Sequence, residues 1–293
     1  MTNVKIIECP RDAMQGWKTF IPTEKKIEWI NTLLQVGFDT LDFGSFVSPK
    51  AIPQLADTRE VLAKIKMSNT KLLAIIANTR GAEEAVQYDE ISYLGFPFSI
   101  SETFQKLNTN SSMADSLIRV EEIQKLCIQK NKQLVIYISM GFGNPYGDPY
   151  NAEVALKWVD ELQKLGVQIF AMSDTVGVSA PDNISYIFSN LQAEFSNLEF
   201  GAHFHSTKEK AAEKIDAALK SGCRRFDAAI GGIGGCPMAQ DDLVGNLATE
   251  KLLNTLEQNG YSFSFNQEAF IKAQAISSSI FNVSSKPIDD TTA

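Results

Sequence analysis

The chain has 293 residues, of which 44% are hydrophobic and 21% are charged, so it can build a large apolar core. Its net charge of −8 excludes an overall positive field, and we therefore expect no nucleic-acid partner and no anionic membrane surface. The chain shows no leader-like start and no apolar run of about 18 residues, which favours a cytoplasmic protein without a membrane span. Four widely spaced cysteines without a CxxC pair argue against a structural zinc site or a disulfide scaffold.

Short apolar or β-branched runs alternate with amphipathic helical stretches along the chain, a pattern typical of parallel α/β folds. Gly37, Gly166 and Gly222 stand just ahead of strand-like runs, where a glycine can end the preceding helix. Eight strand–helix units in roughly 260 residues predict a (β/α)8 TIM barrel. A doubly wound sheet is the alternative, but no GxGxxG turn follows the first strand. The predicted strands are Val4–Cys9, Phe38–Phe43, Lys71–Ala77, Glu90–Phe96, Gln133–Ser139, Val167–Ser173, Glu199–His205 and Arg225–Ile230.

The connections carry helical periodicity, with apolar positions spaced three or four residues apart on one face. No long Gly/Ser or Pro linker interrupts the chain, so we expect one catalytic domain spanning residues 1–293. The barrel core is predicted at about residues 4–260, and residues 261–293 are interpreted as an extra C-terminal helical segment packed on the barrel. The faces expected to pack inward include Ile27, Ile30, Leu33 and Leu34, and Ala155, Trp158, Val159, Leu162 and Leu165.

A histidine pair lies at the end of the seventh predicted strand, where active sites of such barrels are found. His203 and His205 are the only histidines of the chain, and residues two apart on a strand project to the same side. Ordinary surface or core histidines are the alternative interpretation of an H-x-H pattern. Their position at the predicted catalytic rim favours two imidazoles that bind one cation.

Asp12, at the end of the first strand, is the expected carboxylate ligand, because two neutral imidazoles leave the charge of a divalent cation uncompensated. Mixed nitrogen and oxygen ligands with open positions favour Mg²⁺ or Mn²⁺ as the divalent cation, while Zn²⁺, Co²⁺ and Fe²⁺ stay chemically possible. Arg11, directly before it, could be a surface arginine, but beside a metal it can stabilise an enolate oxygen.

Two further segments carry chemical groups at strand ends. Asp174 follows the sixth strand and is expected in the site, since the next helix begins too late for this residue to be a simple cap. The loop Gly231–Pro237 contains five Gly or Pro residues in seven positions, which gives it the freedom to close over a substrate and deliver the Cys236 thiol. A tight turn with an incidental thiol is the simpler alternative.

These motifs make the chain similar to the 3-hydroxy-3-methylglutaryl-CoA lyases, barrel metallolyases that are related to Claisen-condensing synthases. The resemblance covers nearly the whole chain, and its Ser-Phe-Val-Ser-Pro-Lys and Gly-Gly-Cys-Pro runs are specific to the lyases. The segments that carry it are Val4–Glu8, Pro10–Asp12 with Gln15, Ser45–Lys50, Pro53–Gln54, Pro145–Gly147, Asp174–Gly177, His203 with His205, Gly234–Pro237 and Gly245–Glu250.

The resemblance implies a role for each matching position. Asn246 becomes a fourth metal ligand beside Asp12, His203 and His205, although nothing local in the sequence marks it. The catalytic residues implied are Arg11 for the enolate, Cys236 as the loop thiol, and Asp174 for general acid/base chemistry. The residues expected to bind substrate are Arg11, Gln15, Asp42, Ser45, Tyr146 and Thr175.

The implied reaction is a retro-Claisen cleavage of 3-hydroxy-3-methylglutaryl-CoA, or a close 3-hydroxyacyl-CoA, into acetyl-CoA and a 3-oxo acid such as acetoacetate. The family works in leucine degradation and ketone body metabolism, takes an acyl-CoA as its small-molecule partner, and suggests a possible homodimer. Asp42 stands where the family has Glu, and Ser206–Lys208 replace Asp-Thr-Tyr, so the exact acyl group stays open. A synthase that condenses acetyl-CoA with a 2-oxo acid is the alternative enzyme, and a binding protein on a retired barrel is the non-enzymatic alternative.

Overall fold

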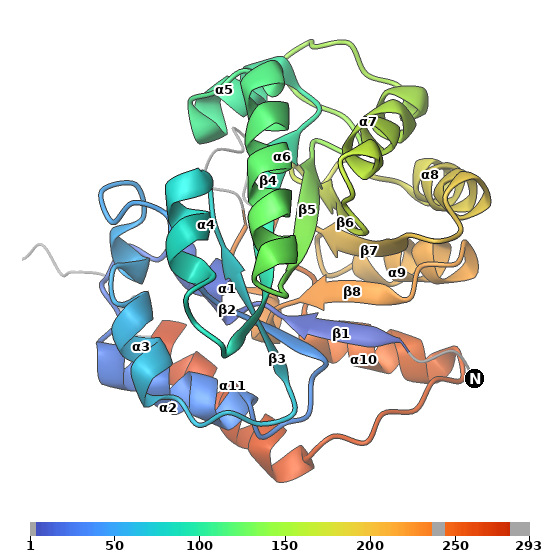
Figure 1. The fold of residues 1–293 in the computed structure, drawn as a ribbon. Helices are drawn as coiled ribbons and strands as arrows, with labels where there is room; N and C mark the ends of the chain where they lie inside the picture. The colour runs from blue at the N-terminus through green and yellow to red at the C-terminus, as the bar shows by residue number, and fades with distance from the viewer. Residues whose placement is uncertain (1–3, 236–243, 282–293) are drawn as a thin grey trace, which may run out of the picture.

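The computed structural model describes residues 4–235 and 244–281 of the chain, and in this part eight parallel strands form a closed barrel (Figure 1). Neighbouring strands follow chain order, and the first strand pairs with the eighth to close the ring. The predicted TIM barrel is thereby confirmed. The strands are β1 (Lys5–Glu8), β2 (Thr40–Ser45), β3 (Lys71–Ile75), β4 (Ile91–Ser99), β5 (Gln133–Ser139), β6 (Ile169–Asp174), β7 (Glu199–Phe204) and β8 (Arg225–Ala228).

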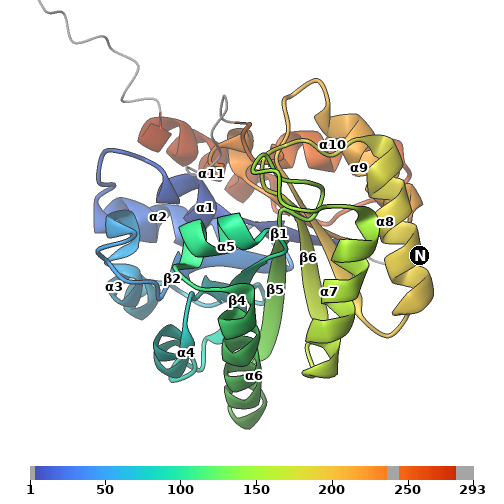
Figure 2. The same ribbon diagram turned by 90° about the horizontal axis from the view of Figure 1, so that it is seen from above.

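Helices surround the barrel, as Figure 2 shows from a second direction. A short helix, α1, follows β1 directly and carries the Arg11-Asp12 pair, whereas the longer helices lie on the outer face of the strands. The helices are α1 (Pro10–Gln15), α2 (Thr23–Leu33), α3 (Thr58–Lys64), α4 (Thr79–Ala85), α5 (Glu102–Thr109), α6 (Met113–Gln129), α7 (Ala152–Lys164), α8 (Pro181–Glu194), α9 (Ala211–Lys220), α10 (Thr249–Gln258) and α11 (Gln267–Phe281), with 3-10 turns η1 (Pro53–Leu55) and η2 (Ile230–Gly232).

The apolar faces predicted from the sequence pack inward. On α2, Ile30 and Leu33 have no exposed surface, and on α7 the same holds for Val159 and Leu162. Gly37, Gly166 and Gly222 adopt positive φ angles of 101°, 92° and 94°, a region that glycine enters without the clash of a Cβ atom. Helical periodicity and glycine position therefore located these helices correctly.

β5 has its predicted limits, and the other strands begin or end one to three residues away from theirs; β2 and β4 extend furthest past their predicted ends. β2 was expected at residues 38–43 but spans Thr40–Ser45, and a bulge between Asp42 and Gly44 shifts its register against β3. β4 continues past Phe96 to Ser99, and Pro97 pairs in register with Tyr137 of β5. Both extensions carry these strands further toward the end of the barrel where the next connections begin.

Side chains inside the barrel form a separate apolar cluster from those between the barrel and its helices. Alternate residues of a strand face opposite sides, so the strands β3 to β6 contribute to both clusters. The inner cluster contains Leu73, Ile75, Tyr93, Val135, Tyr137, Ile169 and Ala171.

The C-terminal helix α11 packs against α2 outside the barrel ring. The ring of Phe281 makes edge contacts with Trp17 and Trp29, at centroid distances of 5.1 and 5.6 Å. These contacts place the helical part of the expected C-terminal segment, residues 267–281, on the barrel beside α2, while residues 282–293 lie outside the described range. Over the two described ranges, none of the helices has both the length and the apolar character needed to cross a membrane.

Candidate metal centre and active site

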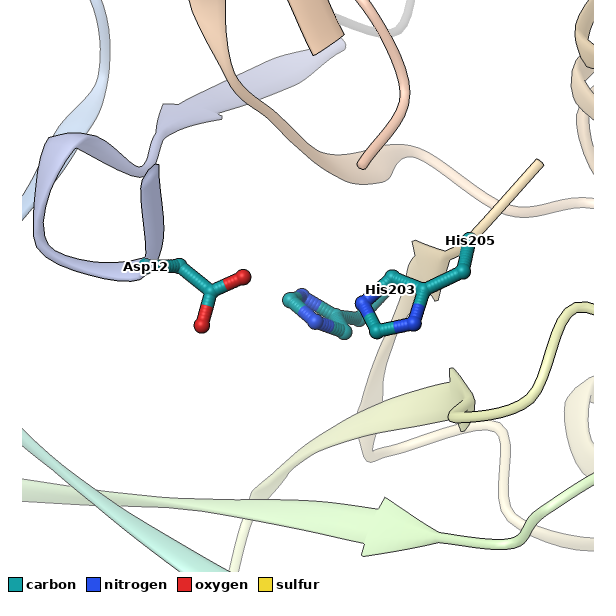
Figure 3. A group of neighbouring side chains, drawn as sticks. All are labelled: Asp12, His203 and His205. Atoms are coloured by element: carbon teal, nitrogen blue, oxygen red, sulfur yellow. The ribbon is translucent and has the colours of Figure 1, made fainter. Parts of the chain in front are cut away.

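Three potential metal ligands meet at the C-terminal end of the barrel. The carboxylate of Asp12 and a ring nitrogen from each of His203 and His205 lie within 4.8 Å of one another (Figure 3). Asp12 comes from α1, His203 from the end of β7, and His205 from the residue directly after β7. The sequence-derived triad is therefore brought together, and its mixed nitrogen and oxygen donors suit a divalent cation.

Hydrogen bonds fix the orientation of both imidazoles. Nδ1 of His205 lies 2.9 Å from the Thr175 carbonyl oxygen, which can only accept, so this nitrogen carries the proton. Nε2 of His205 is then a lone-pair donor, and within the described residues it is buried without a hydrogen-bond partner. Nδ1 of His203 lies 3.1 Å from Oδ2 of Asp227. A buried ring nitrogen that has no hydrogen-bond partner and lies near a carboxylate is suited to bind a cation.

The charges of the triad also match a cation site. Burial alone would raise the pKa of Asp12, but the positive charge of Arg11 and the two histidines lower it to about 2. Burial and the neighbouring His203 lower the pKa of His205 below its usual value. Burial acts in the same direction on His203, yet its hydrogen bond to Asp227 raises its pKa overall. Near neutral pH, the site therefore offers an ionised carboxylate and a neutral imidazole, the forms that bind metals.

Asn246 lies beside this triad. It forms an isolated antiparallel bridge with His205, and its amide nitrogen donates to Oδ2 of Asp12 at 2.7 Å and to the Ile233 carbonyl at 2.9 Å. A Cβ atom on Gly234 would stand 2.7 Å from that amide nitrogen, so the loop passes directly over it. Rotation of the amide would turn its oxygen toward the triad, where an oxygen donor could act as a ligand.

The Arg11 guanidinium is held in place by three side chains. Its Nε and Nη2 donate to Asp42, the latter at 2.6 Å, while Nη1 donates to Asp12 at 2.8 Å and to Gln15 at 2.7 Å. Burial would lower the pKa of Arg11, but Asp42 and Asp12 raise it well above its ordinary value. The side chain is thus a permanent cation in a fixed orientation beside the candidate metal site.

A cavity of about 160 Å³ opens next to the triad and Arg11. One part of its wall is polar and contains the metal ligands, whereas another part is apolar and includes Ile75, Pro97 and Phe104. A small acyl group with polar oxygens at one end fits such a lining. The full lining consists of Arg11, Asp12, Gln15, Val47, Ile52, Ile75, Ala77, Pro97, Phe104, Asn108, Thr109, Tyr137, Ser139, Ser173, Thr175, His203 and His205.

The residues expected to bind substrate fall into two groups. Gln15 and Thr175 line the cavity together with Arg11. The others lie near it: Asp42 is behind Arg11 and fully buried, and the Ser45 hydroxyl donates to the Ile75 carbonyl at 3.2 Å. Tyr146 also lies near the cavity, since its ring centroid is 6.3 Å from that of the lining residue Phe104. The predicted catalytic residue Cys236 lies outside the described residues.

Asp174 is placed differently from the sequence-based expectation of a group in the site. Ser173 and Thr175 line the cavity, so the residue between them points to the opposite side of the strand. Its carboxylate accepts hydrogen bonds from the Ser179 hydroxyl at 2.6 Å and from Lys214 Nζ at 2.7 Å, and it has almost no exposed surface. A general acid/base role for Asp174 finds no support in this geometry.

Asp227 is a neighbour of the site that sequence reasoning missed. It lies within β8, is buried, and holds Nδ1 of His203. The sequence could have indicated Asp227, because a charged residue inside a short buried strand needs a polar partner or a ligand. Its register position opposite His203 on the neighbouring strand supplies the partner.

The chain is similar to known proteins along most of its length. The family model described as HMGL-like matches residues 3–276. The chain is 33% identical over 250 residues to hydroxymethylglutaryl-CoA lyase of Bacillus subtilis (strain 168), covering 85% of this chain and 83% of the relative. It is 33% identical over 267 residues to the cytoplasmic 3-hydroxy-3-methylglutaryl-CoA lyase of Homo sapiens, covering 90% and 71%.

A solved structure extends the similarity to three dimensions. The HMG-CoA lyase of Acinetobacter baumannii, determined in complex with coenzyme A and 3-methylmalate, superposes with a TM-score of 0.88 at 30% identity. The match covers 100% of this chain and 99% of that one. With a matching family model, similar relatives along most of its length and the same barrel, the chain belongs to the HMGL-like family.

Proposed function

We propose that this protein is a metal-dependent carbon–carbon lyase that cleaves 3-hydroxy-3-methylglutaryl-CoA, or a close 3-hydroxyacyl-CoA, into acetyl-CoA and a 3-oxo acid. The observation that carries the proposal is the Asp12, His203 and His205 triad with the fixed Arg11 guanidinium beside one cavity. The named activities of the relatives and the coenzyme A bound by a solved neighbour support an acyl-CoA substrate.

The residues of the chain divide the work of a retro-Claisen cleavage. When bound, Mg²⁺ or Mn²⁺ supplies Lewis acidity that lowers the pKa of the substrate's C3 hydroxyl. Asp12, His203 and His205 would hold the cation, with the Asn246 amide oxygen as a fourth donor. The hydroxyl proton leaves to a base, the C2–C3 bond breaks, and the electron pair moves onto the thioester oxygen as an enolate.

Arg11 is the group we assign to that enolate oxygen. Its cation is permanent and is already oriented by Asp42 and Gln15, so little reorganisation is needed when negative charge develops. The apolar wall around Phe104 excludes water from the acyl group, which strengthens this interaction. Cys236, indicated by its sequence motif, is the acid we assign to protonate the enolate carbon.

The choice of direction rests on the relatives. The synthase alternative would join acetyl-CoA to a 2-oxo acid at the same kind of metal site. The similar proteins described above are named lyases, which favours cleavage. The cytoplasmic location in the name of the human relative supports the same compartment for this chain.

The test is a panel of 3-hydroxyacyl-CoA thioesters, assayed for acetyl-CoA release with Mg²⁺, with Mn²⁺ and with a chelator. We expect metal-dependent release from the methylglutaryl thioester and none with the chelator. His205→Ala should abolish release, because it removes the ligand whose Nε2 has no other described partner. Full activity of that variant with unchanged metal content would contradict the metal assignment. Condensation with a 2-oxo acid in place of cleavage would establish the synthase.

A further inference from the structure

A lysine behind the barrel wall is tied to the metal centre. Lys214 lies on α9 and has no exposed surface. Its ammonium donates to Oδ2 of Asp174 at 2.7 Å, to the His205 carbonyl at 3.0 Å and to the Gly177 carbonyl at 3.1 Å. An ammonium group has three donors, so all of them are used. Each acceptor belongs to the main chain or side chains around the ends of β6 and β7.

The same network closes the loop after β6. Asp174 accepts from the Ser179 backbone at 3.1 Å and from its hydroxyl at 2.6 Å, so the loop folds back on its own first residue. Inside this loop, the Thr175 carbonyl accepts from Nδ1 of His205. Lys214 therefore holds the His205 main chain directly, and through Asp174 and Gly177 it holds the loop that orients the His205 ring.

We propose that Lys214 is a positioning residue of the metal centre, which fixes His205 so that its Nε2 faces Asp12 and His203. The proposal rests on the metal site of the proposed function. The physical reason is that both anchors of His205, its backbone and the acceptor of its ring, are held by one buried ammonium group. Groups that orient a metal ligand in this way affect metal binding although they never touch the metal.

A second buried ion pair gives a matched control. Lys26 is 1% exposed, nearly as buried as Lys214, and its ammonium donates to Asp57 at 2.7 Å and to the Gln54 carbonyl. Within the described part of the chain, none of these three residues shares a hydrogen bond or an ion pair with Asp12, His203, His205 or Asn246. Lys214→Met and Lys26→Met thus make the same chemical change in comparable burial, and both are expected to lower the melting temperature.

Only Lys214→Met is expected to change the metal centre. The dissociation constant for Mn²⁺, measured by titration on folded protein, should rise about tenfold in Lys214→Met and stay within about twofold in Lys26→Met. The chain contains only two histidines, so nitrogen-detected NMR of the metal-free protein shows two imidazoles. The ring resonances of His205 should lose the Nδ1-protonated pattern in Lys214→Met and keep it in Lys26→Met.

Other outcomes overturn the proposal. Equal Mn²⁺ affinities in the two variants, or unchanged His205 resonances in Lys214→Met, would show that Lys214 serves stability alone. Should Lys214→Met fail to fold, Lys214→Gln retains an amide donor, and its Mn²⁺ affinity and His205 resonances decide by the same comparison. A wild-type protein that binds Mn²⁺ but cleaves no acyl-CoA would refute the proposed function and leave this inference standing.

Discussion

Two buried ion pairs flank the metal centre on opposite sides of the barrel wall. Arg11 pairs with Asp42 at the barrel mouth, and the arginine lines the cavity. Lys214 pairs with Asp174 outside the strands, and neither residue lines the cavity. Both carboxylates lie within barrel strands and are almost fully buried. The two ion pairs are thus similar in burial and in hydrogen bonding. They differ in the face of the strand on which they lie, and this determines which pair can contact a substrate.

The largest effect that tests this contrast is expected for Arg11→Met. Loss of a fixed cation from the enolate oxygen should lower kcat for thioester cleavage on the order of a thousandfold. Mn²⁺ binding should persist, because Asp12 and both histidines remain. Steady-state kinetics and metal titration measure the two effects.

The control for that variant is Arg59→Met. Arg59 is 54% exposed in its side chain, pairs with Glu84 on the surface, and does not line the cavity beside the triad. Its kcat should match that of the wild type. If Arg11→Met also kept kcat within about tenfold, the assignment of the enolate oxygen to Arg11 would be wrong.

A smaller effect is expected for Asp227→Asn on the cavity side of β8. Removing the negative charge that faces Nδ1 of His203 should weaken Mn²⁺ binding by roughly ten- to a hundredfold, as with other groups that orient metal-bound histidines. The His203 resonances should shift while those of His205 stay in place, the opposite of the pattern expected for Lys214→Met. Wild-type Mn²⁺ affinity in Asp227→Asn would mean that packing alone orients His203.

The smallest effect concerns Glu8, on the outward side of β1. Burial raises its pKa to about 8, although the Thr249 hydroxyl and the Ile230 amide donate to it. A carboxyl with a raised pKa keeps its proton in the folded state, so stability is full below the unfolded pKa and falls as pH rises through about 8. Between pH 6 and 9, the wild type should lose on the order of 2 kcal/mol from this group.

Glu8→Gln removes that titration. Its free energy of unfolding, measured by denaturant titration at both pH values, should depend less on pH than that of the wild type. Equal pH dependence in the two proteins would show that Glu8 is ionised in the folded state throughout this range.

The sequence predicted most of the fold and the centre of the site, because both follow local periodicity. The two-residue strand period predicts His203 and His205 on the same side of their strand. The location of barrel active sites at the C-terminal ends of the strands predicts Asp12 at the same end. The same period also separates Asp174 from Ser173 and Thr175, and applying it there would have placed the carboxylate outside.

Asn246 shows a different limit of sequence reasoning. It comes from a segment that returns across the barrel end and forms an antiparallel bridge with His205, far from it in the chain. No periodicity marks such a contact, because it depends on the path of the connection after β8. Only family resemblance indicated this residue. The bulge at Asp42 and Gly44 was missed for a related reason, since register depends on the neighbouring strand.

Closure of the barrel between β1 and β8 has a consequence for folding. Lys5 pairs in register with Arg225, and Glu8 with Ala228, so one edge of the first strand stays unpaired until the eighth strand has been synthesised. Contacts between such distant parts of a chain form slowly, because a long loop must be closed before they contribute. Until then, the unpaired edge of β1 is open to pairing with another molecule.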